Sequence, residues 1–299
     1  MSTLTGYYDL SVGPVSFDFV VFMVKAELAR REAKADKLHM VIVPYERGIA
    51  GMFRDKTKLY DEHEMQFRLW NICIPACQLL GANVTLATGW EQAKKLRGEH
   101  VWPADWDRQT LADRRHLIGD LIAASRAGKK IPLLSASEHA RRKVRNIYKA
   151  FGRPVVTMTL RSTYLRERNA DRSAWLVARQ RIEKDGAAVV ILEDTDVALA
   201  QGAGYGELNL DLRMAQYQEA SLNLQANNGA ASLCWFGAAP WRMFTAGVPA
   251  EEWDGLFVRQ GLPLGQSWPW ASEQQRIVYG PTSADQIVAE YEGWKASLG

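Results

Sequence analysis

The sequence is poor in cysteine, has little net charge and contains no long apolar run. Three cysteines in 299 residues are too few for a disulfide framework, and no histidine lies near Cys73 and Cys77 to complete a zinc site, so buried thiols are expected. The net charge of +3 gives no reason to predict a nucleic-acid partner, and none is predicted. No apolar stretch reaches the roughly 18 residues of a membrane-spanning helix, and the N-terminus lacks the pattern of a signal peptide. A cytoplasmic location is therefore expected.

Motifs of several enzyme classes are also absent. The five histidines show neither metal-ligand spacing nor a serine or cysteine partner, which gives little support to nucleophilic catalysis by a triad. The glycine-containing loop 202–207 is not a GxGxxG sequence after a strand, so it is not a dinucleotide-binding fingerprint.

What the sequence does contain is a repeated alternation of strand-like and helix-like segments. In the first half, strands are expected at residues 7–12, 38–44 and 83–87, and helices at 17–34, 60–80 and 91–97. In the second half, strands are expected at residues 155–160, 187–192 and 276–280, and helices at 174–185, 211–224 and 283–298. Such alternation is typical of α/β proteins with a parallel sheet covered on both faces. We therefore predict two Rossmann-like domains, residues 1–140 and 141–299, that face each other across a cleft.

The most informative segment is Pro154 to Trp175, PVVTMTLRSTYLRERNADRSAW. Its apolar, β-branched run ends at Arg161, three further arginines follow, and a helix is expected from about Asp171. Clustered guanidinium groups at the end of a buried strand are suited to hold a phosphate or a carboxylate, and open α/β sheets bind ligands at that edge. Farther along, a turn at residues 227–229 precedes a helix of small residues, where backbone N–H groups can bind a phosphate. Each feature alone also fits a salt bridge or a simple turn, but together they indicate a phosphate-bearing ligand.

The segments TLRSTYLRERNADRSAW and LRMAQYQEASLNLQANNGAASL, with Asp194-Thr-Asp196 between them, resemble bacterial GT-B-type glycosyltransferase-like proteins of cell-envelope polysaccharide biosynthesis. In such enzymes the C-terminal half grips the diphosphate of a nucleotide sugar with a basic strand end and a helix start of small residues. The resemblance implies that residues 141–299 form the donor domain and residues 1–140 the acceptor-side domain. The donor-binding residues that it implies are Arg161, Tyr164, Arg168, Asn169, Asp194, Asp196, Asn227, Asn228 and Gly229.

Asp194 and Asp196 have the spacing of a metal-binding DxD motif, although so short a pattern often arises by chance. They are expected to accept hydrogen bonds from sugar or ribose hydroxyls, or to pair with the arginines. A GT-B-type enzyme requires no metal, because arginine side chains and backbone amides can stabilise the departing phosphate. We therefore expect neither a metal nor another cofactor, since the nucleotide sugar is a substrate.

A transferase that inverts the sugar needs a general base to take the proton of the acceptor hydroxyl. Three carboxylates of the first half lie at or beyond the ends of predicted strands, namely Glu46, Asp18 and Asp55. Glu46 is the first candidate because it lies in a glycine-bounded loop, whereas an acid at the position of Asp18 is also favoured by the dipole of the following helix. The predicted function is metal-independent transfer of a sugar from a nucleotide-sugar donor to a glycan or lipid-linked acceptor of the envelope.

Two other classes of function stay open at this point. A sugar-nucleotide epimerase shares two facing Rossmann-like halves, and a non-catalytic protein of the same fold would bind a nucleotide sugar or a glycan without turnover. The basic segment 126–153 is the expected hinge between the halves and has Glu138 as its only acid. Its helix, with Ser137 as the expected cap, presents either an ordinary solvated face or a contact for an anionic partner such as lipid headgroups or a glycan. The second interpretation places the protein peripherally at the inner face of the membrane.

Overall fold

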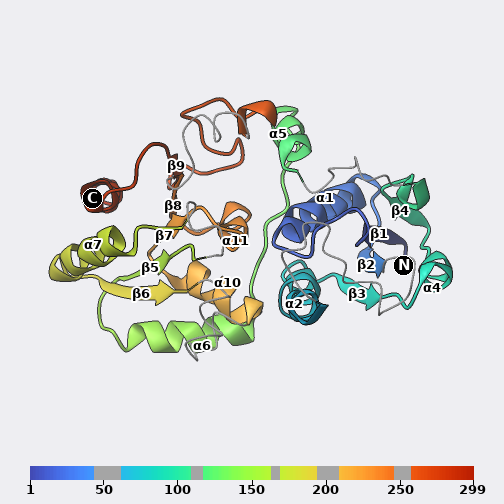
Figure 1. Cartoon of the computed structure of the whole chain (residues 1–299), viewed down its shortest axis with the longest axis horizontal. Coiled ribbons are helices and arrows are strands. Elements are labelled where there is room, and N and C mark those ends of the chain that lie inside the picture. The colour runs from blue at the N-terminus through green and yellow to red at the C-terminus, as the bar shows by residue number, and fades with distance from the viewer. Residues whose placement is uncertain (44–61, 109–116, 163–168, 194–208, 246–256) are drawn as a thin grey trace. The chain divides into compact units, whose positions relative to one another are not determined.

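The computed structural model describes residues 1–43, 62–108, 117–162, 169–193, 209–245 and 257–299 (Figure 1). The chain divides into two compact units. Unit 1 comprises Met1–Leu121 and Ile131–Leu134, and unit 2 comprises Ile122–Lys130 and Ser135–Gly299. Each unit is built on a parallel β-sheet of its own.

Unit 1 contains a four-stranded sheet with the order β3-β2-β1-β4, and every pairing in it is parallel. Its elements in chain order are β1 (Thr3–Asp9), α1 (Asp18–Glu32), β2 (Lys37–Val43), α2 (Glu62–Arg68), a π-helical turn (Leu69–Cys73), α3 (Ile74–Gln78), β3 (Asn83–Leu86), α4 (Trp90–Lys95), β4 (His100–Trp102), a 3-10 turn (Trp106–Arg108) and α5 (Gly119–Arg126). The last of these, α5, leads the chain into unit 2.

Burial on both faces explains the composition of β1. Every residue of this strand after Thr3 is buried. On one face Tyr7 stacks on Trp106, with ring centroids 3.7 Å apart, and on the other face Tyr8 meets the edge of Phe19 from α1. Side chains of a strand alternate between the two faces, so adjacent tyrosines can fill two separate packing layers. The strand is therefore a central one in a sheet covered on both sides.

Unit 2 contains a five-stranded sheet with the order β6-β5-β7-β8-β9, again with every pairing parallel. Its elements in chain order are α6 (Glu138–Lys149), β5 (Val155–Thr159), α7 (Arg172–Lys184), β6 (Ala188–Leu192), α10 (Leu210–Glu219), β7 (Leu222–Ala226), α11 (Ala231–Trp235), β8 (Trp241–Phe244), β9 (Gln275–Val278) and α13 (Ala284–Ala296).

The two faces of the second sheet differ in chemistry. On one face Met158 of β5 and Leu224 of β7 join an apolar core that includes Trp175 of α7. The opposite face carries polar side chains that are nonetheless fully buried, namely Thr157, Thr159, Asn223 and Gln225. The hydroxyl of Thr157 donates a hydrogen bond to Oδ1 of Asn223 across the two strands at 2.6 Å. Buried polar groups are stable when they are hydrogen-bonded in this way.

Several expectations from the sequence are confirmed. Both sheets are parallel and strands alternate with helices, so the protein is of the α/β class with two Rossmann-like domains. Ser137 caps α6 as expected, and the helix expected to begin near Asp171 does so, with Asp171 as its cap. The three cysteines are buried free thiols, and burial raises the pKa of each of them. None of the described helices is both long and apolar enough to cross a membrane.

The prediction of one helix over residues 211–224 is wrong. α10 ends at Glu219, and β7 begins at Leu222. The reason is visible in the sequence SLNLQA, because Leu222 and Leu224 lie on one face while Asn223 lies on the other, which is the period of a strand. The short strands β4 and β8 were not predicted either.

Candidate functional site

The carboxyl edge of the second sheet has a topological switch point between β5 and β7. The chain passes from β5 to β6 on one side of β5, and it later places β7 on the other side (Figure 1). In open parallel sheets, ligands bind outside the carboxyl ends of the strands at such a point. The residues that follow β5 and β7 there are Arg161 and the turn 227–229, so the structure brings together two features that lie 66 positions apart in the sequence.

Arg161 joins the ends of these two strands. Its Nη1 atom donates a hydrogen bond to the backbone oxygen of Asn227 at 2.8 Å. The backbone oxygen of Arg161 accepts a hydrogen bond from the amide of Ala170 at 3.0 Å, so the chain returns to the strand end shortly before α7 begins. A guanidinium carries five N–H donors in one plane, a geometry that suits the oxygens of a phosphate. The hydrogen bond to the carbonyl of Asn227 orients this guanidinium.

The turn after β7 is held by the side chain of Asn228, which is buried. Its Oδ1 atom accepts a hydrogen bond from the amide of Ala231 at 2.9 Å, and its Nδ2 atom donates to the backbone oxygen of Leu160 at 3.4 Å. Asn227 is also buried, whereas Gly229 is exposed at the tip of the turn. The asparagine side chain thus ties the turn to the end of β5 and leaves the glycine at the surface of the sheet edge.

Two arginines hold the neighbouring end of β6. Arg172, at the start of α7, donates to both carboxylate oxygens of Glu193, at 3.1 and 2.6 Å, and this hydrogen bonding raises the pKa of Arg172. Arg213 of α10 is fully buried and donates to the backbone oxygen of Glu193 at 2.7 Å and to the Tyr217 hydroxyl at 3.1 Å. That hydroxyl also shares a hydrogen bond with Thr159 of β5. A hydrogen-bonded positive charge therefore lies buried next to the carboxyl ends of β5 and β6.

Sequence reasoning did not single out Arg213, although a signal was present. Leu210, Arg213, Met214 and Tyr217 lie at the spacing i, i+3, i+4 and i+7, and all four are buried. An arginine inside the apolar stripe of an amphipathic helix needs hydrogen-bond partners in the core. Arg213 has them in Glu193 and Tyr217. Arg172, one of the arginines that follow β5 in the sequence, is a salt-bridge partner.

The remaining donor-side candidates are placed only in part. Asn169 is half-buried and directly precedes Ala170, whose amide binds the end of β5. The other candidates, Tyr164, Arg168, Asp194 and Asp196 on the donor side and Glu46 and Asp55 among the catalytic acids, lie outside the described residues. Their predicted roles stay predictions.

Asp18 is the catalytic candidate that the structure describes. It is the first residue of α1, it is exposed, and its Oδ2 atom accepts a hydrogen bond from the Ser16 hydroxyl at 2.9 Å. In the first sheet β1 lies between β2 and β4, so the switch point of unit 1 lies beside β1. Because α1 directly follows β1, its first turn begins on the carboxyl side of that sheet.

The loop between β1 and α1 is anchored to the strand. The hydroxyl of Tyr8 donates to the backbone oxygen of Pro14 at 2.6 Å, and the amide of Leu10 donates to the oxygen of Val43 at the end of β2 at 3.0 Å. Gly13 packs so closely on the Tyr8 ring that a Cβ atom there would lie 2.5 Å from Cζ. Burial raises the pKa of Tyr8 well above its usual value, so its hydroxyl stays a donor. These contacts hold in place the loop that leads from β1 to Asp18.

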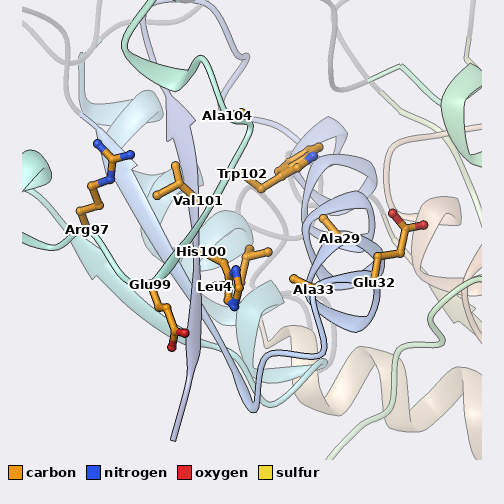
Figure 2. A pocket seen from close by; sticks show the side chains of 10 residues that line it. All are labelled: Leu4, Ala29, Glu32, Ala33, Arg97, Glu99, His100, Val101, Trp102 and Ala104. Carbon is orange, nitrogen blue, oxygen red and sulfur yellow. The ribbon is translucent and has the colours of Figure 1, made fainter.

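Unit 1 also has a surface pocket of about 470 Å³ (Figure 2). It lies between the C-terminal end of α1, with Ala29 and Ala33, and the edge strand β4, with His100 and Trp102. Leu4, near the start of β1, also lines it, so the pocket lies at the opposite end of β1 from the carboxyl edge. It is therefore separate from the switch-point site of the sheet.

The prediction of metal independence concerns Asp194 and Asp196 above all. Among the described residues, no group of three or more histidine, cysteine, aspartate or glutamate side chains is placed to hold a metal ion. The DxD aspartates, however, are not among those residues. Metal independence stays a prediction.

No family model and no curated protein matches the sequence. Solved structures do match. A glycosyl transferase of family 9 from Veillonella parvula gives a TM-score of 0.56 at 10% identity, over 99% of this chain and 98% of that chain. TibC, a bacterial iron-containing dodecameric glycosyltransferase from enterotoxigenic E. coli, gives a TM-score of 0.52 at 11% identity, over 100% of this chain and 77% of that chain.

The chain has a GT-B-type fold. This confirms the two Rossmann-like domains that the sequence predicted, one in each unit. At such low identity the likeness concerns the fold, and the roles of individual residues rest on the chemistry of the two sheet edges. In this GT-B-type chain those edges carry Asp18 in unit 1, and Arg161 with the turn 227–229 in unit 2.

Proposed function

We propose that this protein is a glycosyltransferase that moves a sugar from a nucleotide-sugar donor to a glycan or another acceptor of the cell envelope. The observation that carries the proposal is the meeting of Arg161 and the turn 227–229 at the switch point of the second sheet, in a chain with a GT-B-type fold. The two structural neighbours named above are glycosyltransferases, which supports the same class of reaction.

The donor side of the reaction needs a site for a departing diphosphate. When the bond between the anomeric carbon and the diphosphate oxygen breaks, negative charge develops on that oxygen. Guanidinium groups and oriented backbone N–H groups stabilise such charge without a metal. We assign this role to Arg161 and Arg168, with Gly229 allowing the backbone to approach the phosphate closely. The buried guanidinium of Arg213 lies next to the same edge.

The acceptor side needs a carboxylate that takes one proton. In the proposed step the acceptor hydroxyl oxygen attacks the anomeric carbon, its proton passes to the carboxylate, and the nucleoside diphosphate leaves. Glu46, Asp18 and Asp55 are the candidates. Asp18 gains support from its exposed carboxylate at the first turn of α1, on an anchored loop beside β1. Glu46 and Asp18 are therefore tested against each other.

The mechanism is proposed to be independent of metal. The presence of iron in TibC is a property of that protein and makes a direct test necessary here. Loss of activity on chelation, with recovery on addition of manganese, would assign Asp194 and Asp196 to a metal and remove this part of the proposal. We further propose that the protein acts on the cytoplasmic side, where nucleotide sugars would serve as donors.

The decisive experiment is a thermal-shift screen of nucleotides and nucleotide sugars, followed by analysis of the products with and without acceptor. A ligand at 100 times its dissociation constant stabilises the folded state by about 2.7 kcal/mol, which is readily measured. Stabilisation by one class of nucleotide sugar, together with sugar transfer to an added acceptor, is the expected result. A changed sugar nucleotide formed without any acceptor would identify an epimerase, and binding without turnover would identify a non-catalytic protein.

A further inference from the structure

The helix α6 has two faces that use its basic residues differently. The inner face buries Ala140, Val144 and Tyr148. At its border Arg141 and Arg145 both bind the carboxylate of Glu219 on α10, with distances of 2.8 to 2.9 Å. Figure 1 shows α6 lying alongside α10 in unit 2. These two guanidinium groups therefore attach the helix to the domain, and both pair with the carboxylates of Glu219 and Glu138.

The outer face of α6 keeps its positive charge. We call this surface the outer α6 face, and it consists of Arg142, Lys143, Ile147 and Lys149 of the helix and of Phe151 and Arg153 just after it, all of which are exposed. In the described part of the chain, none of its four cations forms an ion pair. The only acid of the helix, Glu138, lies 3.9 Å from Arg141 and 3.5 Å from Arg145, on the border of the inner face.

The same segment of the chain exposes two large apolar side chains. Ile147 is 60% exposed and Phe151 is 43% exposed. Lys149 is explained in part by the helix dipole, because a cation in the last turn is stabilising. No such local reason applies to Arg142 and Lys143, which lie in the middle of the helix, or to the exposed isoleucine.

We infer that the outer α6 face docks on an anionic lipid bilayer. Lysine and arginine side chains are attracted to anionic headgroups, and neighbouring apolar side chains insert into the boundary between headgroups and acyl chains. A nucleic acid would be attracted to the cations but would leave Ile147 exposed, so the mixture of charge and apolar surface favours lipid. The inference is independent of sugar transfer, because docking needs neither donor nor acceptor.

The test is co-sedimentation of the full-length protein with vesicles of mixed phosphatidylglycerol and phosphatidylcholine, compared with vesicles of phosphatidylcholine alone, at about 0.1 M salt. The wild type is expected to bind the mixed vesicles and not the neutral ones. The double variant Arg142→Ala/Lys143→Ala is expected to bind roughly 25-fold more weakly, since each cation near the surface contributes about a fivefold factor. The double variant Ile147→Ser/Phe151→Ser should lose the part of the binding that resists high salt.

Two matched controls keep the test specific. Arg142→Lys/Lys143→Arg retains the charge and should bind like the wild type. Lys94→Ala/Lys95→Ala removes two adjacent, exposed helical cations from α4 in unit 1 and should also bind like the wild type. Circular dichroism and the melting temperature confirm that each variant is folded.

Three results would overturn the inference. The first is a wild type that does not sediment with the mixed vesicles. The second is equal binding by the wild type and by a folded Arg142→Ala/Lys143→Ala variant. The third is displacement from the vesicles by a short RNA or DNA duplex that binds more tightly through the same cations, which would reassign the outer α6 face to a nucleic acid.

Discussion

The Nη1 atom of Arg161 donates a hydrogen bond to the backbone oxygen of Asn227 at 2.8 Å and so joins the carboxyl ends of β5 and β7. This contact gives one guanidinium two tasks. It fixes the relative position of two strand ends, and it holds a planar cation at the switch point of the sheet. Variants of Arg161 must therefore be judged on both stability and ligand affinity.

Replacing Arg161 by alanine is expected to weaken nucleotide-sugar binding by roughly 1.5 to 3 kcal/mol, the range for hydrogen bonds to charged groups. Arg161→Lys should restore only part of the affinity, because lysine lacks the planar fork of donors. Calorimetry measures the affinity, and the melting temperature reports the lost bond to Asn227. Lys184→Ala, an exposed cation of α7, is the control. Unchanged affinity in both Arg161→Ala and Arg168→Ala would remove the donor from this strand end.

The general base is tested with Glu46→Gln and Asp18→Asn. Removal of the true base is expected to lower turnover by roughly a hundredfold or more while donor affinity stays unchanged. Asp18 is exposed, so its replacement should cost little stability beyond a weakened charge at the first turn of α1. Steady-state kinetics with saturating donor separates the two candidates. If neither variant loses turnover, Asp55 or a different mechanism must be considered.

Glu219 provides a prediction for the dependence of stability on pH. Hydrogen bonds from Arg145 and Arg141 hold the pKa of Glu219 below its usual value, and burial opposes this shift. A lowered pKa in the folded state means that the carboxylate stabilises the fold at neutral pH and that this contribution is lost as the pH falls through the folded pKa. Glu219→Gln is expected to lower the free energy of unfolding by about 1 kcal/mol at pH 7, since both arginines are partly solvated. The difference from the wild type should vanish in acid, as measured by urea unfolding.

The anchored loop of unit 1 predicts a difference between two glycines. At Gly13 a Cβ atom would lie 2.5 Å from the Tyr8 ring, so Gly13→Ala must displace either the ring or the loop. We expect a loss of roughly 1 to 3 kcal/mol in the free energy of unfolding. Gly89 has an extended backbone and open space around its Cβ position, so Gly89→Ala is the matched control and should leave the melting temperature nearly unchanged. Equal melting temperatures for the two variants would contradict the close contact.

Much of the fold could be predicted from the sequence because the signals were local. Alternating strand and helix patterns gave the α/β class, and the side chains of Ser137 and Asp171 marked helix starts that the structure confirms. The boundary between α10 and β7 failed because a helix and a strand follow each other with only two residues between them. The order of the strands depends on long-range pairing, which no local pattern in a single sequence records.

The candidate site was predictable to a similar extent. The end of a buried strand at Arg161 and the turn 227–229 could both be found, but their contact could not, because it depends on the pairing of β5 with β7. The sequence also did not show which basic residues of α6 form ion pairs and which stay exposed. Arg141 and Arg142 are adjacent in the sequence, yet only the first binds Glu219, and this follows from which side of α6 packs on α10.

The hydrogen bond between Thr157 and Asn223 sets the alignment of the candidate site. Thr157 lies four positions before Arg161 and Asn223 lies four positions before Asn227, and the two strands are paired so that Thr157 is opposite Asn223. A shift of the strand register by one residue would turn the asparagine side chain into the apolar layer. The buried pair therefore fixes the register of β5 and β7, so that Arg161 and Asn227 follow at equivalent positions beyond the two strand ends. A single insertion or deletion between this pair and the site would therefore separate Arg161 from Asn227.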